Sequence, residues 1–299
     1  MMIAMKKKWL VICSAVLLAG AFIYVANNSQ ILGKTRRTRP ARRFILSQSW
    51  AQRAYARVTA RKQAAKRLAA ATAAAANDPM LTQADFTSRI NALIGQTRVD
   101  VSVLDTQTGR QLTFQNGGSN FWQASSIKAA ILTMLVEDDG PLSGNLDKTA
   151  QAMIRFSDND AATSLFYRVG GFRALMAFWA KLGMTGTVAN YSGFGLSSTT
   201  AADQIKLLQY IKKMPAVDQA YILNVMAGIV PGQRFGIGTM PDPAFKNGWL
   251  NNAQDRWYVN SIGFADKERY LVAILTENNL DQASGQQLTS RIADSILKK

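Results

Sequence analysis

The sequence contains no histidine and a single cysteine, Cys13. Without an imidazole, the chain cannot use a Ser-His-Asp relay, so a catalytic serine would have to pass its proton to another group, for which a buried lysine is the best precedent. One cysteine excludes an intramolecular disulfide and a cysteine-type metal site, and zinc held by carboxylates alone is not expected. We therefore expect neither a metal nor another cofactor.

Acidic residues are also missing from the N-terminal part of the chain. The first 67 residues hold 15 of the 35 Lys and Arg and no Asp or Glu, which leaves 20 basic against 19 acidic residues in the remainder. The formal charge of +16 therefore belongs to an N-terminal tail, while the rest of the chain is nearly neutral. Because nucleic-acid binding by a folded domain needs a basic face, no nucleic acid is expected as a partner.

The N-terminal tail divides into two segments. Three lysines at positions 6–8 precede an uncharged apolar stretch at 9–26, the order found in an export signal, and 18 residues are barely enough to span a bilayer. Residues 1–26 are thus predicted to be a signal peptide or a membrane anchor. Residues 27–77 read as a basic linker rich in Ala and Arg, whose helix formers favour an exposed helical stalk over 47–76.

Residues 78–299 are predicted to form one domain. Hydrophobic periodicity indicates a helix at 81–94, a hairpin of strands at 99–103 and 110–114, an almost entirely helical region at 125–227, strands at 244–250, 257–264 and 270–276, and a last helix at 282–298. Strands at both ends with helices between them predict an α/β protein of the α+β type. Its antiparallel sheet would be flanked by helices and interrupted by an inserted all-helical lobe.

The first chemical motif is Ser125-Ser126-Ile127-Lys128, which opens an apolar helix. A buried helix start aims free N–H groups at the adjacent cleft, and residues at i and i+3 share one face. Burial against a hydrophobic helix lowers the pKa of a lysine toward the range of a general base. A Ser-x-x-Lys match alone is weak, since Ser295 to Lys298 also matches at the expected end of the last helix. A plain helix cap at Ser125 remains the simpler alternative.

Two further motifs follow the first along the chain. Ser157-Asp158-Asn159 lies between two helical stretches, where such residues also serve as caps, and Lys246-Asn247-Gly248 lies on a predicted strand, where a glycine lets a ligand approach the backbone. Each motif has an ordinary structural explanation. Their joint occurrence in matching helix, loop and strand contexts favours a functional one.

With these three motifs, residues 80–299 resemble the penicillin-recognising serine enzymes, and most closely the class A β-lactamases and related D,D-peptidases. The resemblance implies that Ser125 is acylated and that Lys128 is its base. It also implies that Ser157 relays a proton to the leaving group, that Asn159 orients Lys128 and the substrate, and that Lys246 attracts the substrate carboxylate. Asn247, Gly248 and Trp249 would line the substrate, with the N–H groups of Ser125 and Trp249 as the oxyanion hole.

The sequence departs from the class A β-lactamase pattern at three points. No Asp or Glu occurs between Asp160 and Asp203, so the loop at 186–200 lacks the glutamate that activates the deacylating water. Asn247 replaces a threonine or serine, and the spacing from Ser125 to Ser157 is shorter than in the β-lactamases. Efficient β-lactam hydrolysis is therefore not expected.

The sequence thus predicts an extracytoplasmic serine hydrolase or acyltransferase of the bacterial cell envelope, secreted or membrane-anchored. Its substrate would be a peptide, amide or ester, of which a peptidoglycan-derived peptide is one example. Residues 34–67 would be a solvated spacer or would bind a membrane or anionic cell-wall polymer. The excess of basic residues after the apolar stretch opposes export by the positive-inside rule. A non-catalytic module that binds the cell wall or a partner is the alternative function.

Overall fold

The computed structural model describes residues 56–66, 80–118 and 120–298, and the chain divides into two units between Asn77 and Asp78. In the first unit, residues 56–66 form a helix with mostly exposed side chains, so the predicted stalk is helical over this part. The remainder of that stalk, the linker and the signal or anchor predicted at 1–26 lie outside the described residues. Among the residues that are described, no helix is both long and apolar enough to cross a membrane.

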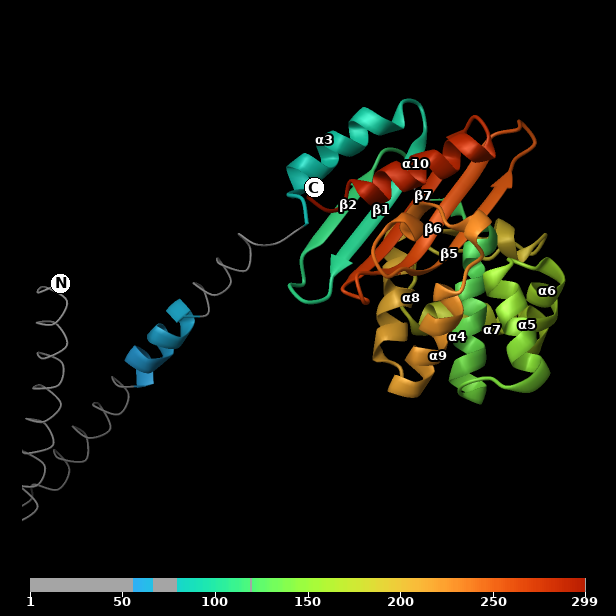
Figure 1. Ribbon diagram of the computed structural model, residues 1–299, viewed down its shortest axis with the longest axis horizontal. Helices are drawn as coiled ribbons and strands as arrows, with labels where there is room; N and C mark the ends of the chain where they lie inside the picture. Colours follow the sequence, from blue (N-terminus) through green and yellow to red (C-terminus); the bar gives the residue numbers. More distant parts are fainter. Residues whose placement is uncertain (1–55, 67–79, 119, 299) are drawn as a thin grey trace, which may run out of the picture. The chain divides into compact units, whose positions relative to one another are not determined.

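The second unit is built on one five-stranded antiparallel sheet (Figure 1). Its strands follow the order β2-β1-β7-β6-β5. They are β1 (Arg98–Asp105), β2 (Gln111–Gln115), β5 (Ala244–Asn251), β6 (Trp257–Ala265) and β7 (Tyr270–Asn279). Because β1 pairs with both β2 and β7, with Val101 opposite Ile274, the N-terminal hairpin and the C-terminal strands form a single sheet. The predicted sheet of distant chain segments is confirmed.

Helices cover both faces of the sheet, as Figure 1 shows. One face packs on α3 (Gln83–Ile94) and α10 (Gln282–Asp294). The other packs on a helical lobe made of α4 (Lys128–Asp139), α5 (Gly144–Arg155), α6 (Asn159–Arg168), α7 (Gly171–Lys181), α8 (Ala201–Lys213) and α9 (Ala216–Ala227). Side-chain alternation along the strands divides the core accordingly. Val272 and Ile274 face α3 and α10, whereas Leu271 and Ala273 face the lobe.

The structure corrects the sequence prediction in the region expected to be helical and at the last helix. The segment before α4 and the segment before α8 form a two-stranded antiparallel ribbon, in which β3 (Phe121–Trp122) pairs with β4 (Ser198–Thr199). The last helix ends at Asp294 instead of continuing to 298, because Ile296 is drawn into the core and Leu297 forms a β-bridge with Met80. The second Ser-x-x-Lys match therefore does not lie on a helical turn.

Candidate active site

Ser125 lies in a tight turn that leads into a helix buried over most of its length. The turn is a 3₁₀ helix, η1 (Ala124–Ile127), and α4 follows from Lys128, with every residue of α4 buried through Val136. The prediction that Ser125 opens the α-helix itself is therefore wrong by one turn. The reason is the left-handed backbone at Ala124, with φ of 51°, which turns the chain sharply before the α-helix begins. Ser125 is partly exposed, whereas Ser126 is buried and donates its hydroxyl proton to the Gln123 carbonyl at 2.6 Å.

The buried Lys128 amine contacts the second motif. Its Nζ donates to Ser157 O at 2.7 Å, to Asn159 Oδ1 at 2.8 Å and to Ser157 Oγ at 3.3 Å. Removal from water disfavours the ammonium form and lowers the pKa of Lys128 to about 8, although the charge of Asp158 partly opposes this shift. A lysine with such a pKa is neutral in a useful fraction of molecules near neutral pH, so it can accept a proton.

The Ser157 motif lies at the junction of two helices, as the sequence predicts. The preceding helix α5 ends at Arg155, and α6 begins at Asn159 after the Asp158 side chain accepts a hydrogen bond from Ala161 N at 2.7 Å. Ser157 itself has a left-handed φ of 59°. This conformation places both its carbonyl and its hydroxyl toward Lys128, so the motif caps a helix and contacts the amine at the same time.

Lys246 approaches the same hydroxyl from the sheet. Its Nζ donates to Ser157 Oγ at 3.0 Å and to Asn247 O at 2.8 Å, and its side chain is completely buried on β5. Burial, and then the positive charge of Lys128, hold the pKa of Lys246 well below its usual range. The Ser157 hydroxyl can both donate and accept, so it connects two amines of lowered pKa.

The structure therefore brings Lys128, Ser157, Asn159 and Lys246 together through hydrogen bonds, while Ser125 lies on η1, three residues before Lys128. Within residues 80–118 and 120–298, Ser125 Oγ makes no hydrogen bond. Lys128 has all three of its N–H donors directed at Ser157 and Asn159. Proton transfer from Ser125 consequently requires the neutral Lys128 amine to turn its lone pair toward Ser125 Oγ.

Gly248 brings strand β5 against the serine turn. A Cβ atom at this position would lie 2.5 Å from Ser126 N, 2.7 Å from Gln123 O and 2.8 Å from Ser125 N, distances that no real Cβ contact shows. The glycine lets two backbones touch where the sequence suggested the approach of a ligand. Trp249 follows directly on the edge strand, and its ring meets Phe235 with centroids 5.9 Å apart.

Asn247 points away from the two lysine amines. Its completely buried amide donates to Gln233 O at 2.8 Å and to Phe235 O at 3.1 Å, because neighbouring residues of a strand face opposite sides of the sheet. Those contacts tie β5 to the loop at 233–235. The substrate role predicted for Asn247 thus has no support from the orientation of its side chain.

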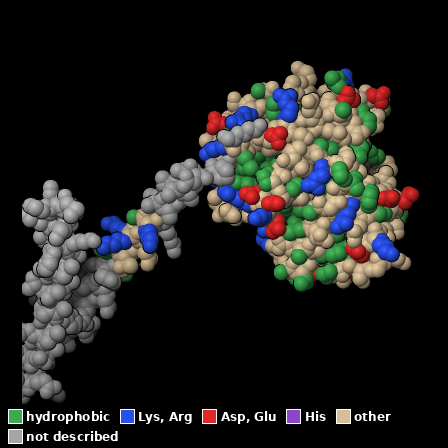
Figure 2. Space-filling view, in the orientation of Figure 1, with side chains coloured by type: hydrophobic (Ala, Val, Ile, Leu, Met, Phe, Trp, Pro, Cys, Tyr) green, Lys and Arg blue, Asp and Glu red, His purple; other side chains and the backbone are tan. Residues whose placement is uncertain are grey.

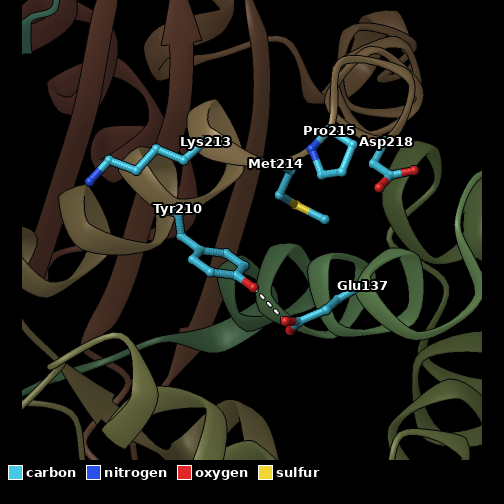
Figure 3. A pocket seen from close by; sticks show the side chains of 6 residues that line it. All are labelled: Glu137, Tyr210, Lys213, Met214, Pro215 and Asp218. Atoms are coloured by element: carbon cyan, nitrogen blue, oxygen red, sulfur yellow. Dashed lines mark hydrogen bonds between the residues drawn. The ribbon is translucent and has the colours of Figure 1, made fainter.

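Two carboxylates outside the three motifs, Asp203 and Glu137, are engaged elsewhere. Asp203, which ends the acid-free segment, is buried and accepts from Gly186 N, Thr187 Oγ and Lys206 Nζ, each at 2.8 Å, so it anchors the base of the loop at 186–200. Glu137 lines a separate cavity of about 220 Å³ (Figure 3), accepts from Tyr210 at 2.5 Å and pairs with Lys181. It lies nine residues after Lys128, which is ~14 Å along α4. Both carboxylates are thus committed to partners outside the three motifs.

Comparison with known families supports the assignment that the motifs suggest. The Beta-lactamase enzyme family, described as Beta-lactamase2, matches residues 139–299, which is more than half of the chain. The protein belongs to this family. The match includes the Ser157 and Lys246 motifs but begins after Lys128, so membership does not depend on the Ser-x-x-Lys sequence.

Solved structures show the same fold. TLA-1 extended-spectrum beta-lactamase is 18% identical, with a TM-score of 0.62, over 73% of this chain and 98% of that one. A class A beta-lactamase from Bacteroides cellulosilyticus DSM 14838 is 15% identical, with a TM-score of 0.62, over 72% and 96%. PBP-A is 18% identical, with a TM-score of 0.59, over 73% and 97%. No curated protein matches the sequence significantly. These identities establish the fold, which confirms the predicted architecture, and do not by themselves establish an activity.

Two residues with evident roles at the site were absent from the sequence prediction. Gln233 links the lobe to the sheet, because its side-chain Nε2 donates to Phe156 O at 3.0 Å while its backbone carbonyl accepts from Asn247 Nδ2. Asn260 on β6 contacts the backbone just before η1. The only signal in the sequence was Asn260 itself, since asparagine is uncommon within a strand that is otherwise apolar.

Proposed function

We propose that the protein is a serine hydrolase or acyltransferase that forms an acyl-enzyme at Ser125 on a peptide, amide or ester. The observation that carries the proposal is the hydrogen-bonded group of Lys128, Ser157 and Lys246, with Ser125 on the turn that leads into Lys128. Membership of the Beta-lactamase family supports the same chemistry. A β-lactam is one reagent of this class, and a peptidoglycan-derived peptide is a natural substrate that fits it.

In the proposed acylation step, Ser125 Oγ attacks the carbonyl carbon while its proton passes to the neutral Lys128 amine. The tetrahedral oxyanion is bound by the N–H groups of Ser125 and Trp249, where each such donor is worth about 3–4 kcal/mol of transition-state stabilisation. The proton then moves through the Ser157 hydroxyl to the leaving nitrogen or oxygen, and the carbon–leaving group bond breaks. Lys246 donates a hydrogen bond to Ser157 and, in its protonated form, attracts a substrate carboxylate where one is present.

Release of the acyl group is the slow step of this scheme. Asp203 and Glu137 are committed to other partners, and the loop at 186–200 contains no acidic residue. A hydrolytic water would then rely on the amines, whose protonated forms are poor bases. The acyl-enzyme is accordingly expected to be long-lived, and efficient β-lactamase activity is not part of the proposal.

The deciding experiment is intact-mass analysis of the full-length protein after incubation with a fluorescent penicillin, a fluorophosphonate and an activated ester. A single adduct should form and map to Ser125, and it should be absent from the Ser125→Ala variant. Ser126→Ala is the matched control, because Ser126 is buried and already bonded to Gln123. Failure of all three reagents to modify the wild-type protein would rule out the proposed activity.

The acylation rate should rise with pH. Because burial brings the pKa of Lys128 to about 8, its neutral form is scarce at pH 6 and predominates above pH 8. The rate should therefore be roughly 100-fold lower at pH 6 than on a plateau above pH 9, with an apparent pKa that belongs to the coupled pair of lysines. Stopped-flow labelling with a neutral ester, corrected with the Ser125→Ala protein, measures this. A rate that does not change between pH 6 and 9 would argue against a lysine base.

A non-catalytic binding module is the second proposal, and the position of Ser125 favours it. Its hydroxyl makes no hydrogen bond to a described residue, and the Lys128 donors are directed at Ser157 and Asn159. In that case peptidoglycan fragments bind the wild-type and Ser125→Ala proteins with equal affinity, and neither protein is acylated. Calorimetry together with the mass experiment separates the two proposals.

The location of the protein is likewise a proposal. Export to the bacterial cell envelope, with residues 34–67 docked on a membrane or anionic polymer, agrees with the exposed Arg57, Arg61, Lys62 and Lys66 of the helix at 56–66. Charged side chains of both signs are interspersed over the face of the second unit seen in Figure 2. In a protein that begins at residue 27, and so lacks the apolar segment, deletion of residues 34–67 should abolish sedimentation with anionic vesicles. Unchanged sedimentation of the deleted protein would refute this docking role.

A further inference from the structure

Asn260 is a buried amide in the middle of the sheet. It lies on β6 directly opposite Gly248 of β5, and no part of its surface is exposed. Asparagine is disfavoured in strands, and a buried amide is tolerated only when its polar atoms find partners. Its contacts therefore indicate what the residue does at this position.

Both N–H donors of the amide go to the chain just before the nucleophile turn. Asn260 Nδ2 donates to Trp122 O at 2.7 Å and to Gln123 O at 3.1 Å, and Asn260 Oδ1 accepts from Thr276 N at 3.3 Å. The side chain thus links the end of β3 and the residue before η1 to the central sheet by hydrogen bonds between residues more than 130 positions apart in the sequence.

The Gln123 carbonyl accepts the hydrogen bonds that close the turn at the start of η1. It accepts from Ser126 N at 3.1 Å and from Ser126 Oγ at 2.6 Å, in addition to Asn260. The next residue, Ala124, has a φ of 51°, a conformation that L-residues with a side chain adopt only when the surroundings hold them there. Because Ser125 follows immediately, the direction of its hydroxyl depends on this turn being kept.

We propose that Asn260 is a positioning residue for Ser125: its amide holds the Gln123 carbonyl, and with it the left-handed turn at Ala124, so that Ser125 faces Lys128 and Ser157. The inference rests on the proposed function and extends it to a residue that touches neither substrate nor reacting atoms. Without the amide, the turn can relax toward an ordinary backbone conformation. Ser125 would then lose its alignment while the substrate-binding surface of β5 stays in place.

Asn279 offers a matched control. It is also an almost completely buried asparagine of the same sheet, and its Nδ2 donates to Trp257 O and to Thr276 Oγ, both at 2.9 Å. Both amides therefore have two hydrogen-bonded donors, and both contact Thr276. Only Asn260 contacts the residues that precede Ser125.

The test compares Asn260→Ala and Asn279→Ala in the full-length protein. Both variants should have lower unfolding midpoints, but only Asn260→Ala should show a maximal rate of Ser125 acylation by a neutral ester about 10- to 100-fold below wild type, with the half-saturating ester concentration changed less than threefold. If Asn260→Ala does not fold, Asn260→Ser replaces it, because the shorter side chain cannot span both carbonyls. A maximal rate within twofold of wild type, or an equal loss in Asn279→Ala, would overturn the proposal.

A second measurement does not depend on activity. Amide hydrogen exchange of residues 121–128 reports the Ser126 N–H, which is bonded to Gln123 O in the wild-type protein. This exchange should become at least tenfold faster in Asn260→Ala and stay unchanged in Asn279→Ala. If the wild-type protein is not acylated at all, the proposed function fails, yet the exchange result still decides whether Asn260 holds the turn. Unchanged protection of Ser126 would refute that role.

Discussion

Replacement of Lys128 by methionine should reduce the rate of Ser125 acylation by about 10²- to 10⁴-fold, the range typical for loss of a general base. Methionine has a similar length and fits an apolar site, so it removes the amine without opening a large cavity. Lys246 is not expected to substitute, because its amine donates to Asn247 O and to Ser157 Oγ and has no hydrogen bond to Ser125. The measurement is the pseudo-first-order rate of ester labelling at pH 8.

Lys181→Met is the control for that prediction. Lys181 also has hydrogen-bonded partners, Glu137 and Tyr210, but these lie near the opposite end of α4. Its replacement should leave labelling within twofold of wild type. If Lys128→Met keeps a tenth or more of the wild-type rate, while the unfolding midpoint shows that it is folded, Lys128 is not the base, and a water or Lys246 must take the proton.

The motifs could be predicted from the sequence because each depends on local pattern. Continuous apolar residues after Lys128 correctly indicated a buried helix, and the cap residues at 157–159 correctly indicated a helix junction. The strand predicted at 244–250 is confirmed as β5, which carries Lys246. The family resemblance that these motifs carry, in their order, placed the lysines and Ser157 at one site in the prediction.

What the sequence could not predict depends on contacts between distant segments. The left-handed turn at Ala124 is not an intrinsic preference of alanine. It persists because Asn260 donates a hydrogen bond to Gln123 O and because the backbone at Gly248 packs directly against the turn. In the same way, the orientation of Asn247 follows from the pleat of β5 and from the loop at 233–235. Local propensity carries no information about either arrangement.

Gly248→Ala should have the second large effect. The added methyl group would lie within 2.8 Å of Ser125 N, Ser126 N and Gln123 O, all of them backbone atoms that cannot rotate away. Strand β5 must then separate from η1, and overpacking of this kind costs about 1–3 kcal/mol of unfolding free energy. Since the same movement separates Trp249 N–H from Ser125 N–H, acylation should fall by roughly 10²- to 10³-fold, as when an oxyanion donor is lost.

Gly232→Ala separates this steric effect from the general cost of replacing glycine. A Cβ at Gly232 would meet no atom within 4 Å, so this variant should match wild type in both denaturant unfolding and ester labelling. If Gly248→Ala loses stability but labels Ser125 at the normal rate, β5 does not supply an oxyanion donor. If it keeps both properties, the two backbones lie further apart in solution. A joint loss confined to Gly248 would mean that the third motif needs its glycine for the contact between β5 and the serine turn, and that this contact sets the geometry of the acylation site.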